Sequence, residues 1–346
     1  MNRVAITGLG AVSAAGFGAS AAWDAVRAGR SAIGPLDCPR GENLQVKIGG
    51  QVRDFDAVAL LSQRKAGMMD RFSHFAVVAA REAAAQAGLA AGSPELTAAG
   101  AVIGIGVGGM DTLDNAFHRI YAESKPRVHP LTIPKLMCNA AASQVSMDLG
   151  ARGITFAIAS ACASGTHAIG IAAQMIRTGS AQIMITGGSE ACISYGTMLG
   201  WEALRVLASD TCRPFSATRS GLVIGEGAGI LILESWDHAT ARGATILGEV
   251  LGFGANADAG DLTSPNADGA ANAIRLALRD ATLTPDKVGY INAHGTGTMM
   301  NDQVESQAVR AAFDGYALPP LSSSKAVLGH ALGAAGALEA VVTVQA

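Results

Sequence analysis

The sequence predicts a layered α/β fold made of two related halves, and three observations support this prediction. Short runs rich in valine and isoleucine alternate with alanine-rich stretches of helical length throughout the 346 residues. Hydrophobic residues make up 49% of the chain and aromatic residues only 5%, so the interior is expected to hold small aliphatic side chains that let helices approach a sheet closely. The order of elements restarts near residue 245, which indicates a duplication and predicts halves at residues 1–245 and 246–346.

The first half contains the elements of a complete α/β unit. Its strands are apolar runs typical of buried strands, and two of its helices end at Gly88 and Gly179, because glycine readily adopts the left-handed conformation that closes a helix. In order, we expect a strand over 3–8, helices over 20–29 and 69–88, a strand over 98–106, a glycine-rich loop, an irregular segment over 125–141, a strand over 154–160, a helix over 165–179, and strands over 181–190 and 227–235.

The second half repeats this order in part. We expect, in turn, a strand over 246–254, a helix over 269–281, a strand over 288–295, a helix over 301–313, a buried segment over 321–330 and a helix over 333–346. The first half has a pair of strands after its third helix, whereas the second half reaches Ala346 without an equivalent pair. The second half is therefore expected to be incomplete, and the two halves are expected to share one core.

Charge and cysteine content argue against several classes of protein. The net charge of −3 comes from intermixed acidic and basic residues, so we expect neither a nucleic-acid nor an anionic-membrane partner. The five cysteines are scattered without a CxxC pair, which argues against a disulfide framework or a metal site and favours a reducing, cytoplasmic compartment. The start MNRVAITGLGAVSAAG is typical of a strand and turn rather than a signal peptide, and no apolar run has membrane-spanning length.

The stretch IASACASGTH, residues 158–167, places a cysteine where a buried strand turns into a helix. A buried cysteine most often acts as a small hydrophobic residue. Cys162, however, is flanked by alanine, serine and glycine residues that are too small to cover it. At a helix start, free backbone amides and the positive end of the dipole favour a thiolate, and the same amides can hold the oxyanion of an attacked thioester. We therefore interpret Cys162 as a nucleophile.

Two of the seven histidines can join Cys162. His294 in INAHGTGT and His330 in SSSKAVLGHALGAAG both stand where a buried strand is predicted to open into a glycine-rich turn, the usual place of site residues in α/β folds. His167 lies more than one helical turn beyond the thiol. The other four histidines are in helical or polar settings that predict ordinary solvated or packed side chains.

Three motifs in order, ACASGTHAIG, NAHGTGTMMND and SSKAVLGHALGAAG, resemble those of the β-ketoacyl synthases with a Cys-His-His triad, the elongating condensing enzymes of fatty-acid and polyketide synthesis. The similarity extends to VAITGLGAVSAAG, MDRF, GGSEA, RPF and GEGAGILILES, and therefore covers essentially the whole chain. The resemblance implies a thiolase-like fold, in which two βαβαβαββ halves form an α-β-α-β-α sandwich, here with an incomplete carboxyl-terminal half.

The resemblance implies a decarboxylative Claisen condensation that elongates a 3-oxoacyl chain in fatty-acid synthesis. Cys162 would take an acyl chain from the phosphopantetheine thiol of an acyl carrier protein, and the enolate of malonyl carrier protein would attack that thioester. Sulfur suits this role because it is both a nucleophile and a leaving group. Neutral His294 and His330 would donate to the oxygen that becomes negative on decarboxylation. The family pattern implies a homodimer, no metal and no cofactor beyond the carrier's arm.

The resemblance also assigns supporting roles near the triad. Lys325 matches the family lysine that supports the histidines electrostatically. Asp302 and Glu305 match an acidic pair that is expected to serve as structural partners of Lys325 and the site.

Substrate contacts are implied on both sides of the nucleophile. Thr296 and Thr298 match threonines that hydrogen-bond the pantetheine arm. The loop GIGVGG, whose spacing does not fit a dinucleotide-binding motif, would border the acyl pocket. Val107 and Met110 would then either line this pocket or pack in the core.

Two features depart from the family pattern. Gly67 and Met68 replace basic residues that usually precede MDRF, which leaves Arg64 and Lys65 to dock an acidic carrier protein, so docking is expected to be weaker or shifted. Family members also continue past the final helix with a glycine-rich phenylalanine loop, whose amide completes the oxyanion hole. We therefore expect this sequence to be a fragment of a longer protein, and a naturally short chain would be expected to be inactive.

Other classes fit the motifs less well. A thiolase would need a second catalytic cysteine late in the chain, whereas the last cysteine is Cys212. A chain-length factor keeps the fold but lacks the nucleophile, and an initiating synthase has asparagine in place of the second histidine. A polyketide-type ketosynthase and an inactive homologue stay open as alternatives, and the preferred acyl chain length is not specified.

Overall fold

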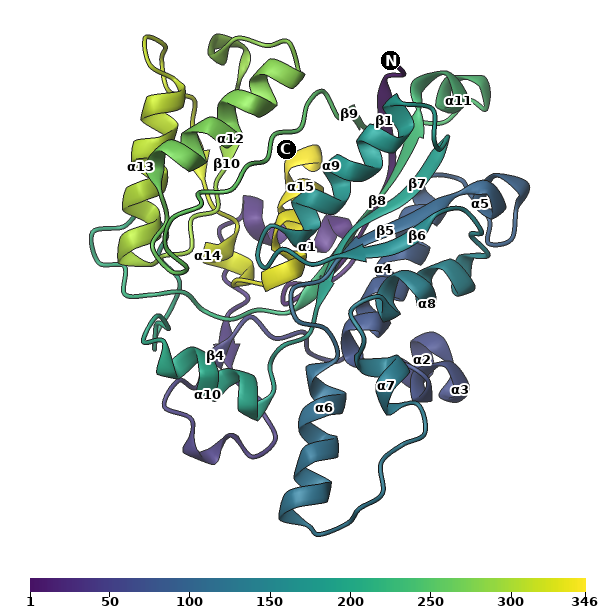
Figure 1. Ribbon diagram of the computed structural model, residues 1–346, viewed down its shortest axis with the longest axis vertical. Coiled ribbons are helices and arrows are strands. Elements are labelled where there is room, and N and C mark those ends of the chain that lie inside the picture. The colour runs from purple at the N-terminus through teal and green to yellow at the C-terminus, as the bar shows by residue number, and fades with distance from the viewer.

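Strands and helices alternate along the chain in the computed structural model, which describes residues 1–346 (Figure 1). The strands are β1 (Val4–Ser13), β2 (Gly16–Phe17), β3 (Gly34–Pro35), β4 (Ile48–Gly49), β5 (Gly100–Gly104), β6 (Thr155–Ile158), β7 (Ile183–Glu190), β8 (Gly227–Ser235), β9 (Gly248–Glu249), β10 (Ile291–Asn292) and β11 (Leu321–Ser322). The α-helices are α1 (Ala19–Arg27), α2 (Ala57–Leu61), α3 (Gln63–Gly67), α4 (Arg71–Gln86), α5 (Pro94–Ala98), α6 (Met110–Phe117), α7 (Thr132–Leu136), α8 (Ala140–Leu149), α9 (Ser164–Arg177), α10 (Tyr195–Ala203), α11 (Trp236–Ala241), α12 (Ala267–Asp280), α13 (Met299–Ala312), α14 (Lys325–Leu328) and α15 (Ala335–Gln345). Shorter turns are the 3-10 helices η1 (Gly41–Asn43), η3 (Pro285–Lys287) and η4 (Leu332–Ala334) and the π-helix η2 (His118–Ala122).

One mixed sheet forms the centre of the first half. Its strands follow the order β2-β1-β8-β7-β5-β6, and β9 also pairs with β1. β5 runs parallel to β6 and β7, whereas β8 runs antiparallel to β1 and β7. Every residue of β1, β7 and β8 is buried, because helices cover both faces of the sheet.

Two helices dominate each face of this sheet. α4 and α8 pack on one face through a buried cluster that includes Phe72, Phe75 and Val145. α9 and α15 pack on the other face, where Ile176 and Leu338 belong to a second buried cluster. Although α15 comes from the second half of the chain, it contacts β7 and β8 of the first sheet. The two halves therefore share one core, as predicted.

The second half adds two further layers beside α9 and α15 (Figure 1). β10 and β11 pair in parallel, and Asn292 of β10 donates through Nδ2 to the carbonyl of Glu339 in α15. α12 and α13 pack on the outer side of this pair around Ala271 and Phe313. The layers follow the order helix, sheet, helix, sheet, helix, so the predicted thiolase-like sandwich is confirmed.

Several predicted boundaries are wrong, chiefly in the second half. The strand expected over 246–254 is only the two-residue β9, and it pairs with the free edge of β1 rather than with β10. The strand expected over 288–295 is reduced to β10, because its one strand partner, β11, is equally short. In the first half, the irregular segment predicted over 125–141 contains α7 and the start of α8.

The predicted helix ends in the first half are confirmed. α4 begins after Asp70, whose carboxylate accepts a hydrogen bond from the amide of Phe72, and the chain turns at Gly88 with φ 72°. α9 is followed by Gly179 with φ 78°. Neither position would accept a side chain without strain. Among the helices, none has the length and apolar character needed to cross a membrane.

Candidate active site

Cys162 lies on a tight turn between β6 and α9. Ala161 immediately before it has φ 50°, a conformation that residues with a side chain adopt only under constraint. Ser164 supplies part of that constraint, because its Oγ accepts from the amide of Ser160 at 2.8 Å and donates to the carbonyl of Ala161 at 2.7 Å. The turn places the half-buried thiol just before the first turn of α9, as predicted from the small residues around it.

His330 lies within hydrogen-bond distance of the thiol. Its Nε2 lies 3.0 Å from Cys162 Sγ. The amide of Leu332 donates to His330 Nδ1 at 3.2 Å, so the ring proton must lie on Nε2, where it points at the sulfur. The backbone of His330 is also held, because its amide donates to Val223 at 2.7 Å and its carbonyl accepts from Gly225 at 2.8 Å.

His294 stands beside His330 at the same cluster. The two imidazole rings are nearly perpendicular at 86°, with centroids 5.3 Å apart. Lys325 Nζ lies 3.3 Å from His294 Nδ1, and an ammonium group can only donate, so the proton of His294 lies on Nε2. Both histidines thus present an Nε2–H group as a hydrogen-bond donor.

Burial controls the protonation of the triad. It lowers the pKa of His294 to about 3 and that of His330 well below its usual value, and the charge of Lys325 lowers both further. Burial also raises the pKa of the Cys162 thiol, which Lys325 opposes. The expectation that the helix start makes Cys162 a ready thiolate is therefore corrected, because loss of hydration outweighs the neighbouring cation and the backbone hydrogen bond that favour the thiolate. At neutral pH the group is a thiol beside two neutral imidazoles.

Lys325 is almost completely buried, at 1% exposure, and all three of its donors have partners. One is His294 Nδ1, the second is the carbonyl of His294 at 2.7 Å, and the third is the carboxylate of Glu339. Asp302 and Glu305, the expected structural partners of Lys325 and the site, make no direct pair with its ammonium group, although the charge of Lys325 opposes the effect of burial, which raises the pKa of Glu305. Glu339 reaches the ammonium group because α15 crosses the site from the second half.

Asp302 and Glu305 hold the backbone around His294 instead. Glu305 accepts from the amides of His294 and Gly295, each at 2.7 Å. Asp302 accepts from Phe215 at 2.7 Å and from Gly297 at 3.1 Å. Their prediction as structural partners of the site is therefore consistent with the structure, although they act on the main chain of the loop.

Glu339 is a site residue that the sequence reasoning missed. The signal was present, because Glu339 is the only charged residue in GAAGALEAVVTVQA, and a carboxylate on an otherwise apolar helix needs a partner. Identifying Lys325 as that partner requires knowledge of which helix packs on the site.

The four predicted substrate contacts have different settings. The hydroxyl oxygens of Thr296 and Thr298 lie 2.9 Å apart, and Thr298 caps α13 by accepting from the amide of Asn301. Met110 packs with Cys162 against one small apolar cluster. Val107 is 42% exposed, and nothing in the structure places it in that cluster.

The triad has the spacing of a set of metal ligands, because one ligand atom, a nitrogen or the sulfur, from each of its three residues lies within 4.8 Å of the other two. The ammonium of Lys325 lies directly behind one of these nitrogens. A positive charge at this distance opposes a metal cation and favours a negative charge developing in front of the rings. The arrangement can therefore attack a thioester with sulfur and stabilise an enolate oxygen with two N–H donors.

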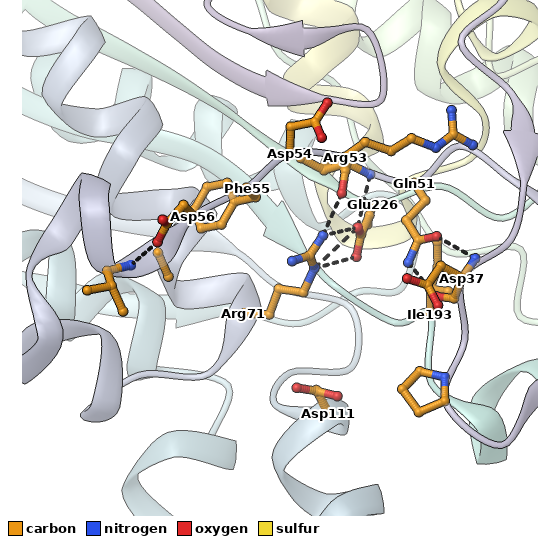
Figure 2. A pocket seen from close by; sticks show the side chains of 14 residues that line it. Asp37, Gln51, Arg53, Asp54, Phe55, Asp56, Arg71, Asp111, Ile193 and Glu226 are labelled. Atoms are coloured by element: carbon orange, nitrogen blue, oxygen red, sulfur yellow. Dashed lines mark hydrogen bonds and ion pairs between the residues drawn. The ribbon is translucent and has the colours of Figure 1, made fainter.

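A surface cavity of about 890 Å³ lies outside the triad, and Arg71 and Glu226 point toward each other within it (Figure 2). Inside it, the guanidinium of Arg71 donates to the buried carboxylate of Glu226 at 2.7 Å and to the carbonyl of Val52 at the same distance. Glu226 directly follows Gly225, whose amide donates to the carbonyl of His330. This ion pair thus anchors the segment before β8, to which the backbone of His330 is hydrogen-bonded through Val223 and Gly225.

The fold and the triad together define a condensing enzyme of the thiolase-like class. Two family descriptions match the chain, "Beta-ketoacyl synthase, N-terminal domain" over residues 1–239 and "Beta-ketoacyl synthase, C-terminal domain" over residues 247–346. The chain belongs to the β-ketoacyl synthase family.

Relatives of this chain have several different names. Nodulation protein E of Rhizobium sp. (strain N33) is 45% identical, with 99% of this chain and 86% of the relative covered. The 3-oxoacyl-[acyl-carrier-protein] synthase 2 of Synechocystis sp. is 39% identical over 99% of this chain and 85% of its own. This chain is also similar to a solved type II polyketide ketosynthase, AntDE, in complex with its acyl-carrier protein AntF and bound to the hexaketide. The two superpose with a TM-score of 0.88 at 34% sequence identity, and the match covers 99% of this chain and 86% of the other.

Proposed function

We propose that this protein elongates a carrier-bound acyl chain by decarboxylative condensation with malonyl-acyl carrier protein, as in fatty-acid synthesis. The observation that carries the proposal is the cluster in which Cys162 Sγ lies 3.0 Å from His330 Nε2 while the His294 ring stands perpendicular to that of His330. In this cluster the sulfur is the nucleophile, and the two imidazole N–H groups are donors.

The first step transfers the acyl chain to Cys162. The sulfur attacks the carbonyl carbon of the carrier thioester, the bond from that carbon to the pantetheine sulfur breaks, and the carrier thiol leaves with the proton that Cys162 gives up. The Nε2–H of His330 donates to the attacking sulfur. This contact helps the thiolate to form in a setting that otherwise disfavours charge.

The second step forms the carbon–carbon bond. Malonyl thioester loses carbon dioxide, and the electron pair of the broken bond moves to the thioester oxygen as an enolate. The N–H groups of His294 and His330 donate to that oxygen. The enolate carbon then attacks the acyl carbonyl, the bond to Cys162 breaks, and the products are a 3-oxoacyl carrier thioester and the Cys162 thiolate.

An acyl carrier protein is the proposed partner, supported by the similar ketosynthase solved with its own carrier. Arg64 is exposed and available to an acidic partner, whereas Lys65 is paired with Asp148 at 2.5 Å. The hydroxyls of Thr296 and Thr298 are proposed to contact the pantetheine arm. The five unpaired cysteines support a reducing, cytoplasmic compartment.

A homodimer is the proposed assembly. β6 is the last strand of the large sheet, so its outer edge has no strand partner within the chain. All of its residues are only half-buried, and Ile154 directly before it is 55% exposed. Pairing with the same edge of a second copy would satisfy these backbone groups.

A second candidate is condensation in a dedicated pathway outside primary fatty-acid synthesis. It is favoured by the higher identity to a nodulation protein than to the 3-oxoacyl synthase of Synechocystis, and by the similarity to a polyketide ketosynthase. Competition between saturated acyl and 3-oxoacyl carrier thioesters separates the two. A preference for the 3-oxoacyl donor supports the second candidate, whereas a preference for the saturated donor supports the first.

The test supplies the protein with acyl and malonyl carrier proteins and follows acyl-enzyme and product by intact mass. We expect an acyl adduct on Cys162 and a condensed product, and we expect Cys162→Ser to lose both by at least about 10³-fold. Cys38→Ser is the matched control, because Cys38 is another half-buried thiol outside the triad. If Cys162→Ser acylates and condenses as well as the parent, the proposal is wrong.

A further inference from the structure

Glu190 is a buried carboxylate that neither proposed step uses. It is the last residue of β7, has 0% exposure, and accepts hydrogen bonds from backbone amides. Its Oε2 accepts from Gly106 at 2.7 Å, from Val107 at 3.1 Å and from Gly333 at 3.2 Å, and its Oε1 accepts from Gly108 at 3.2 Å. One carboxylate thus serves four amides from two segments that are more than 200 residues apart in the sequence.

These two segments meet directly beside the triad. Gly333 lies three residues after His330, and a Cβ on it would be 2.1 Å from the nitrogen of Gly106, so the two backbones are in contact. A Cβ on Gly165 would be 3.0 Å from the carbonyl oxygen of Gly333, and Gly165 lies three residues after Cys162. The loop after β5, the turn of the nucleophile and the turn after His330 therefore converge on the Glu190 carboxylate.

We propose that Glu190 is a positioning residue of the condensing site, which holds His330 Nε2 within hydrogen-bond distance of Cys162 Sγ. This inference rests on the proposed condensation. The physical reason is that four backbone amides converge on one acceptor, and an ionised carboxylate is a side chain that only accepts. A glutamine would turn an NH₂ group toward these amides and push one segment away, and the His330 turn would move with it.

The charge of Glu190 also reaches the nucleophile. Burial is the main cause of the raised pKa of Cys162, and the charge of Lys325 lowers this pKa. The carboxylates of Glu339 and Glu190 raise it further. The two histidines beside the thiol are neutral. Replacing Glu190 with glutamine removes one of the two negative charges, so the pKa of Cys162 should fall. Because burial also acts on this pKa, Glu190→Asp, which keeps the charge, separates the effect of charge from a change in packing.

The experiment compares three variants of the protein in steady-state condensation and in alkylation of Cys162 by iodoacetamide across pH. For Glu190→Gln, we expect kcat to fall about 10- to 100-fold with KM changed less than about threefold, and the alkylation midpoint to move to lower pH. Glu190→Asp keeps the charge but is one methylene shorter, so we expect a loss in kcat of about three- to tenfold and no shift of the midpoint.

Glu82→Gln is the matched control. Glu82 also accepts from two backbone amides, those of Ala11 and Ala19 at 2.8 Å each, and makes no contact with the triad. We expect it to change neither kcat nor the alkylation midpoint. An equal loss of kcat in Glu82→Gln would mean that losing any set of hydrogen bonds between a carboxylate and backbone amides lowers kcat. That result would overturn the proposal.

Other outcomes are equally decisive. A folded Glu190→Gln protein that keeps kcat within twofold of the parent overturns the proposal. Circular dichroism shows whether this variant folds. If it does not fold, an unchanged kcat in Glu190→Asp overturns the proposal. If the parent forms no condensed product, the proposed function fails, but the alkylation comparison still tests Glu190 separately. A midpoint shift in Glu190→Gln then supports its link to Cys162, and the absence of a shift refutes it.

Discussion

At the scale of single residues, two contacts to ring nitrogens determine what the site can do. The Leu332 amide and the Lys325 ammonium occupy the Nδ1 atoms of His330 and His294. Both rings therefore carry their proton on Nε2, and burial keeps both rings neutral. Each ring therefore presents one N–H group that can donate a hydrogen bond to an enolate oxygen, and neither ring has to change its protonation state first.

Lys325→Met tests this arrangement. The variant removes the main positive charge near Cys162 and the donor that keeps the proton of His294 on Nε2. The rate of decarboxylation of malonyl carrier thioester should therefore fall about 10²-fold. Because Lys325 lowers the pKa of Cys162, the midpoint for iodoacetamide alkylation should move to higher pH, opposite to the shift expected for Glu190→Gln. Lys325→Arg, which keeps the charge, should leave the midpoint near that of the parent. A shift to lower pH in Lys325→Met would contradict the role assigned to the ammonium group.

At the scale of elements, the start of α9 lies unusually close to the end of β5. A Cβ on Gly104 would be 2.2 Å from the carbonyl carbon of Ser164 and 2.4 Å from the nitrogen of Gly165. The helix that follows Cys162 can therefore sit directly on the strand, and the thiol is placed by backbone packing. Glycine at position 104 is therefore a condition for this close approach.

Gly104→Ala should destabilise the protein and displace the nucleophile. The added methyl group must push α9 away from β5, and overpacking of this kind costs about 1–3 kcal/mol or more in the free energy of unfolding. Urea denaturation measures this loss, and acyl-adduct formation on Cys162 should fall with it. Gly200→Ala is the control, because Gly200 is exposed in α10 with no atom within 4 Å of an added Cβ. Its stability should rise by about 0.5–1 kcal/mol, as helix propensity predicts. Equal stability of the two variants would refute the close-packing argument.

At the scale of the whole molecule, the site is assembled from both halves of the chain. Cys162 and Glu190 come from the first half, whereas His294, Lys325 and His330 come from the second. Because α15 packs on the first sheet and also carries Glu339, the core and the site share the same element. Loss of packing between the halves would therefore dismantle the triad as well as the core.

Acid should destabilise the folded protein through the same histidines. Their folded pKa values lie below the ordinary value of 6.5, so below that pH the unfolded chain binds more protons than the native protein. The stabilisation is fully present above pH 6.5 and is lost as the pH falls toward about 3, by up to about 1.4 kcal/mol per pH unit for each histidine. Urea midpoints at pH 7.5 and 5.5 measure this loss. His294→Gln should lose about 1 kcal/mol less than the parent over this interval, and a loss equal to that of the parent would contradict the linkage.

The sequence by itself determined the layered architecture, the triad and most helices of the first half. These features depend on local patterns, such as apolar periodicity, the glycines after α4 and α9, and the small residues that leave Cys162 uncovered. The helices could be predicted because each pattern acts on neighbours in the chain, whereas the triad was predicted from the resemblance of three separate motifs to those of a known family.

Only the tertiary structure decided how these parts work together. It shortened the strands of the second half to pairs of residues, replaced the expected acidic partner of Lys325 with Glu339, and brought the amides of Gly106 and Gly333 to one carboxylate. It also reversed the expectation for Cys162, whose thiol is held protonated by burial. The physical reason is that strand pairing, desolvation and ion pairing depend on which distant elements meet, and no spacing along the chain specifies that meeting.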